Sequence, residues 1–192
     1  MLPDYVLSTT PSFSPIVGAR SYAGSLIVDY EDGGVDIQDT SEGLLYQTWK
    51  AAITEDKTTI LLSADNKAEY TFITGTEITE VSLTFDQNMN PCVAYVEDGI
   101  SKFYWYDTSI PSYDTLIING STPKVFLDDK RNSQTGNSDI LLFYLRDDNL
   151  YHGVQRDRFL TEYLLASDVS SDLISVVGMG KDWRVQIHLF IC

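Results

Sequence analysis

A chain of 192 residues is long enough for one domain with a substantial core, and its 43% hydrophobic and 21% charged residues exclude intrinsic disorder. The formal net charge of −15 repels phosphate backbones and anionic lipids, so we expect no direct binding to nucleic acid and no membrane binding. Such a charge is typical of a soluble surface, and it also suits a partner with a basic face or a cation site.

The first twenty residues predict an extended N-terminal arm. Pro3, Pro11 and Pro15 lack the backbone donor that the interior of a strand or helix requires. An arm of this kind is usually loose in a monomer and often lies along a neighbour in an assembly. Residues 1–12 lack the basic and apolar regions of a signal peptide, and no apolar run approaches the roughly 20 residues of a membrane helix.

Residues 21–192 alternate short apolar runs with turns, which predicts an all-β domain, possibly divided into 21–76 and 77–192. No segment keeps an apolar period of 3.6 residues over about three turns. Within the stretch 43–54, residues 44–52 would also fit one or two helical turns, but the alternation of the stretch favours a strand. Strands are expected at 25–29, 35–37, 43–54, 57–62, 69–73, 80–85, 92–96, 100–106, 115–118, 125–127, 140–145, 150–155, 159–166, 171–177 and 183–191.

Three turns share a pattern that suggests an internal repeat. Each follows a strand that ends near a tyrosine (Tyr30, Tyr95 and Tyr144) and combines acidic residues with glycine or asparagine, which tolerate a positive φ. The last two predict four-stranded antiparallel meanders at 77–120 and 121–167, each the size of a propeller blade. The alternative, which is given equal weight, is that unrelated hairpins have acquired the same turn residues independently. Two blades cannot close a ring, so the meanders form either blades of a larger body or a β-sandwich.

No constellation of residues indicates catalysis or a cofactor, so we expect no enzyme and no bound cofactor. His152 and His188 lack zinc-ligand spacing, and neither a nucleophile elbow nor a phosphate loop is present. Carboxylate pairs leave a glycosidase as a third hypothesis, but adjacent strand residues point to opposite sides. The loop 128–139 offers oxygen ligands for Ca²⁺ without the EF-hand spacing, and a solvated loop is favoured. Cys92 and Cys192 are expected to be buried or incidental thiols.

Five residues are predicted as interface or ligand contacts. Tyr104 and Tyr106 are expected on one face of a strand and Trp105 on the other. Such rings serve core packing, an interface, or stacking on a sugar. Arg156 and Arg158 lie on one side of a strand or turn, which predicts structural ion pairs or an interface with carboxylates.

Several strings of residues between 78 and 166 carry a resemblance to a known family. These strings are Phe85-Asp86-Gln87-Asn88 with Pro91 and Val93-Ala94-Tyr95, Tyr104-Trp105-Tyr106-Asp107, Asp128-Asp129-Lys130-Arg131, and Gln155-Arg156-Asp157-Arg158-Phe159. Together they resemble structural proteins of tailed-bacteriophage virions. The resemblance implies a tail-associated protein with blade-like sheets (an adaptor, a nozzle or a fibre-attachment protein) and no catalytic residue.

We therefore expect a structural component of a bacteriophage virion, assembled in the host cytoplasm. Its partners would be other tail or connector proteins and further copies of itself in a homo-oligomer. Contacts would be made through the arm, the sheet edges and the aromatic surfaces. The alternative is a carbohydrate-binding module that uses a Trp/Tyr stacking platform.

Overall fold

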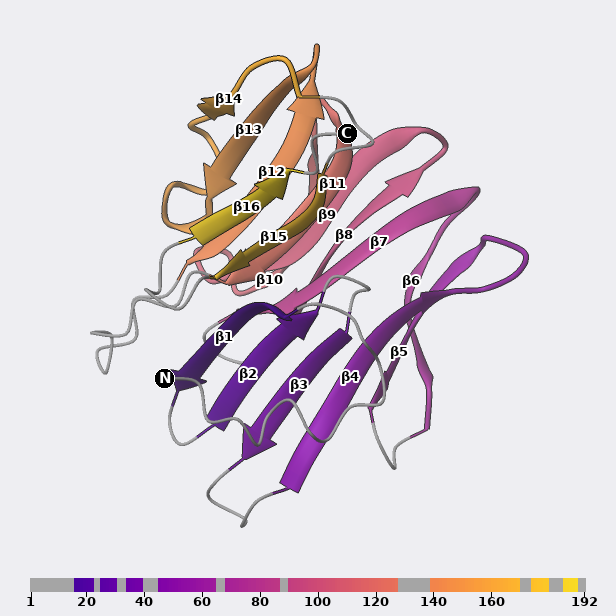
Figure 1. Cartoon of the computed structure of the whole chain (residues 1–192). Coiled ribbons are helices and arrows are strands. Elements are labelled where there is room, and N and C mark those ends of the chain that lie inside the picture. Colours follow the sequence, from indigo (N-terminus) through magenta and orange to yellow (C-terminus); the bar gives the residue numbers. More distant parts are fainter. Residues whose placement is uncertain are drawn as a thin grey trace.

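The computed structural model confirms the predicted all-β class: the described residues form antiparallel sheets (Figure 1). Within the described ranges, the chain contains no helix with the length and apolarity needed to cross a bilayer. The structure describes residues 16–22, 25–30, 34–39, 45–64, 68–86, 90–127, 139–169, 174–179 and 185–189, with side chains in 49–64, 68–86, 90–125 and 139–169.

The strands pair in chain order, as expected for meanders whose consecutive strands are joined by short turns. Strands β1 to β6 form a six-stranded sheet, β7 to β10 and β11 to β14 form two four-stranded sheets, and β15 pairs with β16 (Figure 1). The strands are β1 (Ile16–Tyr22), β2 (Ser25–Tyr30), β3 (Gly34–Asp39), β4 (Leu45–Ile53), β5 (Thr59–Ala64), β6 (Tyr70–Thr74), β7 (Ile78–Phe85), β8 (Pro91–Glu97), β9 (Ile100–Asp107), β10 (Ser112–Ile117), β11 (Ser121–Leu127), β12 (Ile140–Arg146), β13 (Asn149–Val154), β14 (Tyr163–Ala166), β15 (Ile174–Met179) and β16 (Val185–Leu189).

Several strand bounds differ from the sequence prediction, most notably at the predicted arm and at residues 159–166. The predicted arm overlaps β1 (Ile16–Tyr22), which pairs with β2, and the residues before β1 lie outside the described part of the chain. The strand predicted at 159–166 is shorter and begins at Tyr163. Arg158 and Phe159 have φ values of 58° and 60°, and this left-handed backbone interrupts an extended strand. The apolar run that suggested a longer strand therefore begins in a loop.

The middle sheet, β7 to β10, is covered on both faces. On one face, Leu83, Phe85 and Val93 share an apolar cluster with Ile60 and Leu62 of the six-stranded sheet. A strand covered on both faces reads as a continuous apolar run, which explains the unbroken burial of β8 from its second residue to its sixth. The middle sheet therefore lies between its two neighbours.

The opposite face of the middle sheet packs on the sheet β11 to β14. Phe103 and Trp105 contribute to this second cluster from β9. Leu142 contributes from β12, and Phe159 contributes from the loop between β13 and β14. Strands β7 and β11 also meet directly, because the backbone N–H of Val125 donates to the Ser82 hydroxyl over 3.1 Å. These contacts fix the two four-stranded sheets against each other.

The outward face of β12 carries a third apolar cluster. Leu141, Phe143 and Leu145 are buried there with Leu150 and Val169. The second and third clusters together bury β12 on both faces. Its sequence is therefore a continuous apolar run that does not alternate with polar residues.

The hairpin turns of the two four-stranded sheets occupy the same place in each sheet. Asp98 and Gly99 join β8 to β9, whereas Asp147 and Asp148 join β12 to β13, and all four have a positive φ. Two left-handed residues make a turn whose twist matches the strands it joins. In the second turn aspartates adopt this conformation, and Asn149 instead donates its side-chain amide to the carbonyl of Asp147 over 2.9 Å.

Candidate functional site

Trp105 lies in the core between the two four-stranded sheets. It is 4% exposed and packs edge-on against Phe159, with ring centroids 5.1 Å apart. Phe103, on the same face of β9, stacks on it at 6.4 Å. The Trp105 ring therefore has no free face for a sugar, which removes Trp105 from the predicted stacking platform.

Tyr104 and Tyr106 share the other face of β9, as the alternation predicts. Tyr104 stacks on Tyr113 of β10, with centroids 4.7 Å apart, and Tyr106 meets the same ring edge-on at 5.4 Å. Phe72 of the six-stranded sheet packs against Tyr104 at 5.4 Å. These half-buried rings hold β9 to β10 and to the six-stranded sheet.

Arg156 and Arg158 form ion pairs, one of the two roles predicted for them. They belong to the short 3₁₀ turn η2 (Gln155–Asp157) and the residue after it. The Nε of Arg156 donates to Asp139 over 2.8 Å, and Arg158 pairs with Asp107 at 2.6 Å. Burial raises the pKa of Asp107, but hydrogen bonds from Ser109 and the charge of Arg158 outweigh it and lower that pKa overall. Both arginines therefore anchor the η2 turn.

Metal ligands do not gather in the described part of the chain. No group of three or more His, Cys, Asp or Glu side chains lies together there. The loop considered for Ca²⁺ lies outside the described residues except for Asp139, which faces Arg156. Cys92 is buried in the second cluster.

His152 connects the third cluster to the outer strand of its sheet. Its ring stacks on Phe143 at 5.7 Å and on Tyr163 of β14 at 5.0 Å. Burial lowers its pKa, and the negative charge of Asp157 opposes this only in part.

This environment predicts a pH dependence of stability. Because the folded-state pKa of His152 lies below the ordinary value of about 6.5, the unfolded chain binds the proton first as the pH falls. The stabilising effect of neutral His152 is complete above that value and is lost as the pH falls through it. We expect the free energy of unfolding to drop more between about pH 7.5 and pH 5.5 in the native chain than in His152→Gln. Urea titrations at both pH values measure the free energy of unfolding. An equal drop in that free energy in the native chain and in His152→Gln would show that His152 does not contribute.

The outer strand β14 presents apolar side chains to solvent. It is the last strand of its sheet and pairs only with β13 there (Figure 1). Tyr163, Leu164 and Leu165 are exposed along it, and Leu160, just before it, is 82% exposed. Isolated exposed apolar residues are ordinary, but three in a four-residue outer strand, with a fourth three positions before it, make this strand a candidate contact surface. We call these four residues the β14 edge.

The outer strand of the neighbouring sheet, β10, differs from β14 because it carries a charged residue. Strand β10 carries the exposed charge of Asp114 at its centre. A charge on an edge strand discourages pairing with another chain. Strand β14 has no charge and no proline; its protection is its short length and the register shift in its pairing with β13.

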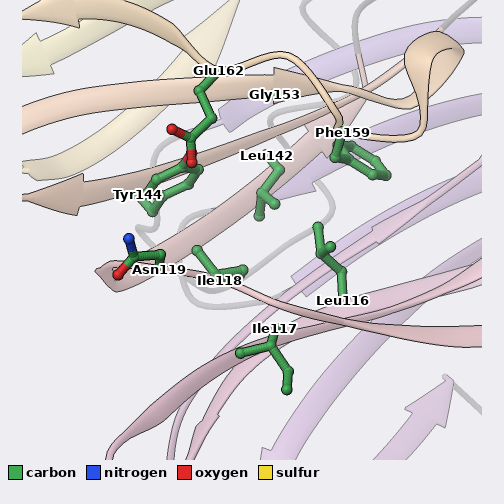
Figure 2. Close-up of a pocket in the computed structure, with 9 residues that line it drawn as sticks. All are labelled: Leu116, Ile117, Ile118, Asn119, Leu142, Tyr144, Gly153, Phe159 and Glu162. Atoms are coloured by element: carbon green, nitrogen blue, oxygen red, sulfur yellow. The ribbon is translucent and has the colours of Figure 1, made fainter.

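A small pocket opens beside the β14 edge, between the two four-stranded sheets (Figure 2). Its volume is about 100 Å³. Figure 2 shows the Glu162 carboxylate beside the Tyr144 ring and the amide of Asn119, with mainly apolar side chains around the rest. The lining residues are Leu116, Ile117, Ile118, Asn119, Leu142, Tyr144, Gly153, Phe159 and Glu162.

Arg146 neutralises the charge at this rim. Its guanidinium donates to both oxygens of Glu162, over 3.0 and 2.7 Å, and lies 4.3 Å from the centre of the Tyr151 ring. The Tyr144 hydroxyl donates to Glu162 over 2.6 Å. The hydrogen bonds from Arg146 and Tyr144 hold the pKa of Glu162 below its usual range. The carboxylate is therefore ionised and fully paired.

Comparison with known proteins adds one structural likeness. No protein-family model and no curated protein matches this chain. A solved structure of a luciferin-regenerating enzyme is similar at a TM-score of 0.35 and 12% sequence identity, over 81% of this chain and 62% of that one. The match thus spans less than two thirds of that enzyme.

This finding corrects the predicted function. The structural likeness is to a named enzyme and not to a virion protein, so the prediction of a tail-associated virion component is wrong. Those of the strings that lie in the described residues form ordinary parts of a sheet: a core strand, an aromatic ladder and an ion-paired turn. The string at 128–131 lies outside the described residues. At this TM-score the likeness carries no argument about activity.

Sequence reasoning did not find the β14 edge. The run from Leu160 to Leu165 was predicted as part of a strand, but which strand would be outermost depends on the order of strands in the sheet. The available signal was an apolar run without lysine or proline, which is also typical of a buried strand.

Proposed function

We propose that this protein acts by binding rather than by catalysis, and that it takes an extended segment of another protein as an additional strand along β14. The observation that carries this proposal is the uncharged outer strand with exposed Tyr163, Leu164 and Leu165. An edge strand has backbone donors and acceptors without partners in its own sheet, and an added strand satisfies them. The apolar side chains then become buried in the new contact.

Charge indicates what kind of segment would bind. The protein has a net charge of −15, and exposed Asp147, Asp148 and Asp168 lie at one end of the β14 edge. They are held together because the N–H of Val169 donates to the carbonyl of Asp148 over 2.7 Å. A segment that alternates apolar and basic residues would match both the strand and this field.

A second copy of this chain fits the same edge poorly. A second copy has the same net charge of −15 and the same exposed Asp147, Asp148 and Asp168 beside its β14, so the two chains repel. The homo-oligomer expected from the sequence stays a prediction, and self-association is one outcome of the test.

The test uses a synthetic peptide of about eight residues that alternates valine and lysine, labelled for fluorescence anisotropy. We expect saturable binding to the full chain, weakened at high salt. We expect Leu165→Lys to weaken it by about tenfold or more, because the variant removes an apolar contact and adds a like charge. The same peptide with a central proline should not bind, since proline cannot donate to the ladder.

Ile110→Lys provides the matched control. Ile110 is also exposed, lies in the turn between β9 and β10, and gives the same change in net charge. If Ile110→Lys weakens binding as much as Leu165→Lys, only the overall charge matters and the edge is not the site. Concentration-dependent dimerisation that is lost in Leu165→Lys would indicate a second copy as the occupant and overturn the proposal.

A further inference from the structure

The pocket near the β14 edge lies between the end of β10 and the face of β12 and β13 that carries Leu142, Tyr144 and Gly153. Leu116 and Ile117 line it from the end of β10, and Glu162, directly before β14, lines it from the other side. Both strands are the outermost of their sheets. Because Glu162 lines the pocket, a segment that lies along β14 and continues past its first residue would reach the pocket. On the β10 side, Ile117 is 68% exposed.

The size of the pocket decides the class of its occupant. Sites for free small molecules enclose roughly 300–1,000 Å³. A pocket of about 100 Å³ is too small for such a molecule but has room for one aliphatic side chain. Pockets of this kind hold the single anchoring residue of a protein partner, which supplies much of the binding energy.

The chemistry of the lining makes that residue apolar and uncharged. Ile118, Leu142 and Phe159 form the inner wall. The one carboxylate at the rim, Glu162, is already engaged by Arg146 and Tyr144. A lysine or arginine side chain would find no unpaired charge there and would lose its hydration.

We propose that the pocket receives one branched aliphatic side chain, that of leucine, isoleucine or valine, from the segment that pairs with β14. This inference rests on the proposed function, because the segment must first lie along that edge. The strand pairing sets where the segment lies, and the pocket selects which residue stands at one position of it.

The test is a positional scan with peptides of about eight residues that alternate threonine and lysine. A single leucine replaces threonine at each position in turn, and anisotropy gives the affinity of each peptide for the full chain. We expect one position at which leucine binds about tenfold tighter than alanine, and little preference elsewhere. Tryptophan at that position should bind more weakly than leucine, since it exceeds the volume of the pocket.

Two variants connect the preference to the pocket. Gly153→Ala adds a methyl group to the pocket wall; its Cβ would lie 3.4 Å from Phe159, an ordinary contact, so the fold should persist. We expect it to reduce the preference for leucine over alanine. Ile117→Ser should reduce it as well, whereas Ile100→Ser, at an exposed isoleucine in β9 away from the pocket, should not.

The outcomes separate this inference from the proposed function. If the peptides bind and Leu165→Lys weakens them, but leucine has no preferred position, the pocket is not an anchor and only the further inference fails. If the preference exists but survives both pocket variants, the anchor lies elsewhere and the inference also fails. If no peptide of either design binds, both proposals fail together.

Discussion

Replacing Phe159 by alanine is expected to lower the free energy of unfolding by about 3–5 kcal/mol, as for other buried aromatic residues. Phe159 comes from the loop after η2 and inserts into the cluster shared with the middle sheet. Its ring meets Phe103 edge-on at 5.2 Å and Trp105 edge-on at 5.1 Å. The substitution therefore opens a cavity between two sheets and removes two aromatic contacts at once.

Urea denaturation of the purified chain measures this loss as a lower midpoint at an unchanged slope. Tyr70→Ala serves as the comparison, because Tyr70 is an aromatic residue that is already half exposed and leaves little cavity. If Phe159→Ala lowered the free energy of unfolding no more than Tyr70→Ala does, the loop that carries Phe159 would not hold the two sheets together.

Gly120→Ala is the second substitution with a large expected effect. Gly120 lies in the connection between β10 and β11, close to the backbone of β12. A Cβ there would lie 2.5 Å from the carbonyl oxygen of Leu145 and 2.6 Å from the ring of Tyr144. Neither atom can retreat easily, because Leu145 belongs to a central strand and the Tyr144 hydroxyl is bonded to Glu162. We expect a loss of about 1–3 kcal/mol from this overpacking.

Gly153→Ala is the matched control for this second prediction. Both glycines are in or beside the same sheet, but a Cβ at Gly153 would make only ordinary contacts with Phe159. Thermal or urea unfolding should therefore separate the two variants clearly. Equal stability of the Gly120 and Gly153 variants would mean that the connection moves away from β12 at little cost.

The sequence was sufficient for most of the strands and for the two faces of β9. The alternation around Trp105 placed it opposite Tyr104 and Tyr106, and the structure confirms this arrangement. Such alternation is a local property, since successive strand residues point to opposite sides. The two hairpin turns with positive φ were likewise encoded locally, by aspartate, glycine and asparagine.

The surroundings of each face could not be predicted in this way. Trp105 was considered for a stacking platform because the sequence does not say that a second sheet covers its face. The partners of Arg156 and Arg158 are Asp139 and Asp107, which lie on other strands or loops and are brought close only by folding. The candidate binding edge depends on β14 being outermost, which is a matter of strand order.

The central claim is that β14 accepts an added strand, and amide hydrogen exchange tests it most directly. The full chain is compared with and without the valine–lysine peptide, residue by residue. We expect slower exchange at Tyr163–Ala166 when the peptide is bound, because new backbone hydrogen bonds form there, and no change along Ser112–Ile117 of β10. Bound peptide that leaves the exchange of β14 unchanged, or that protects β10 instead, would contradict the account.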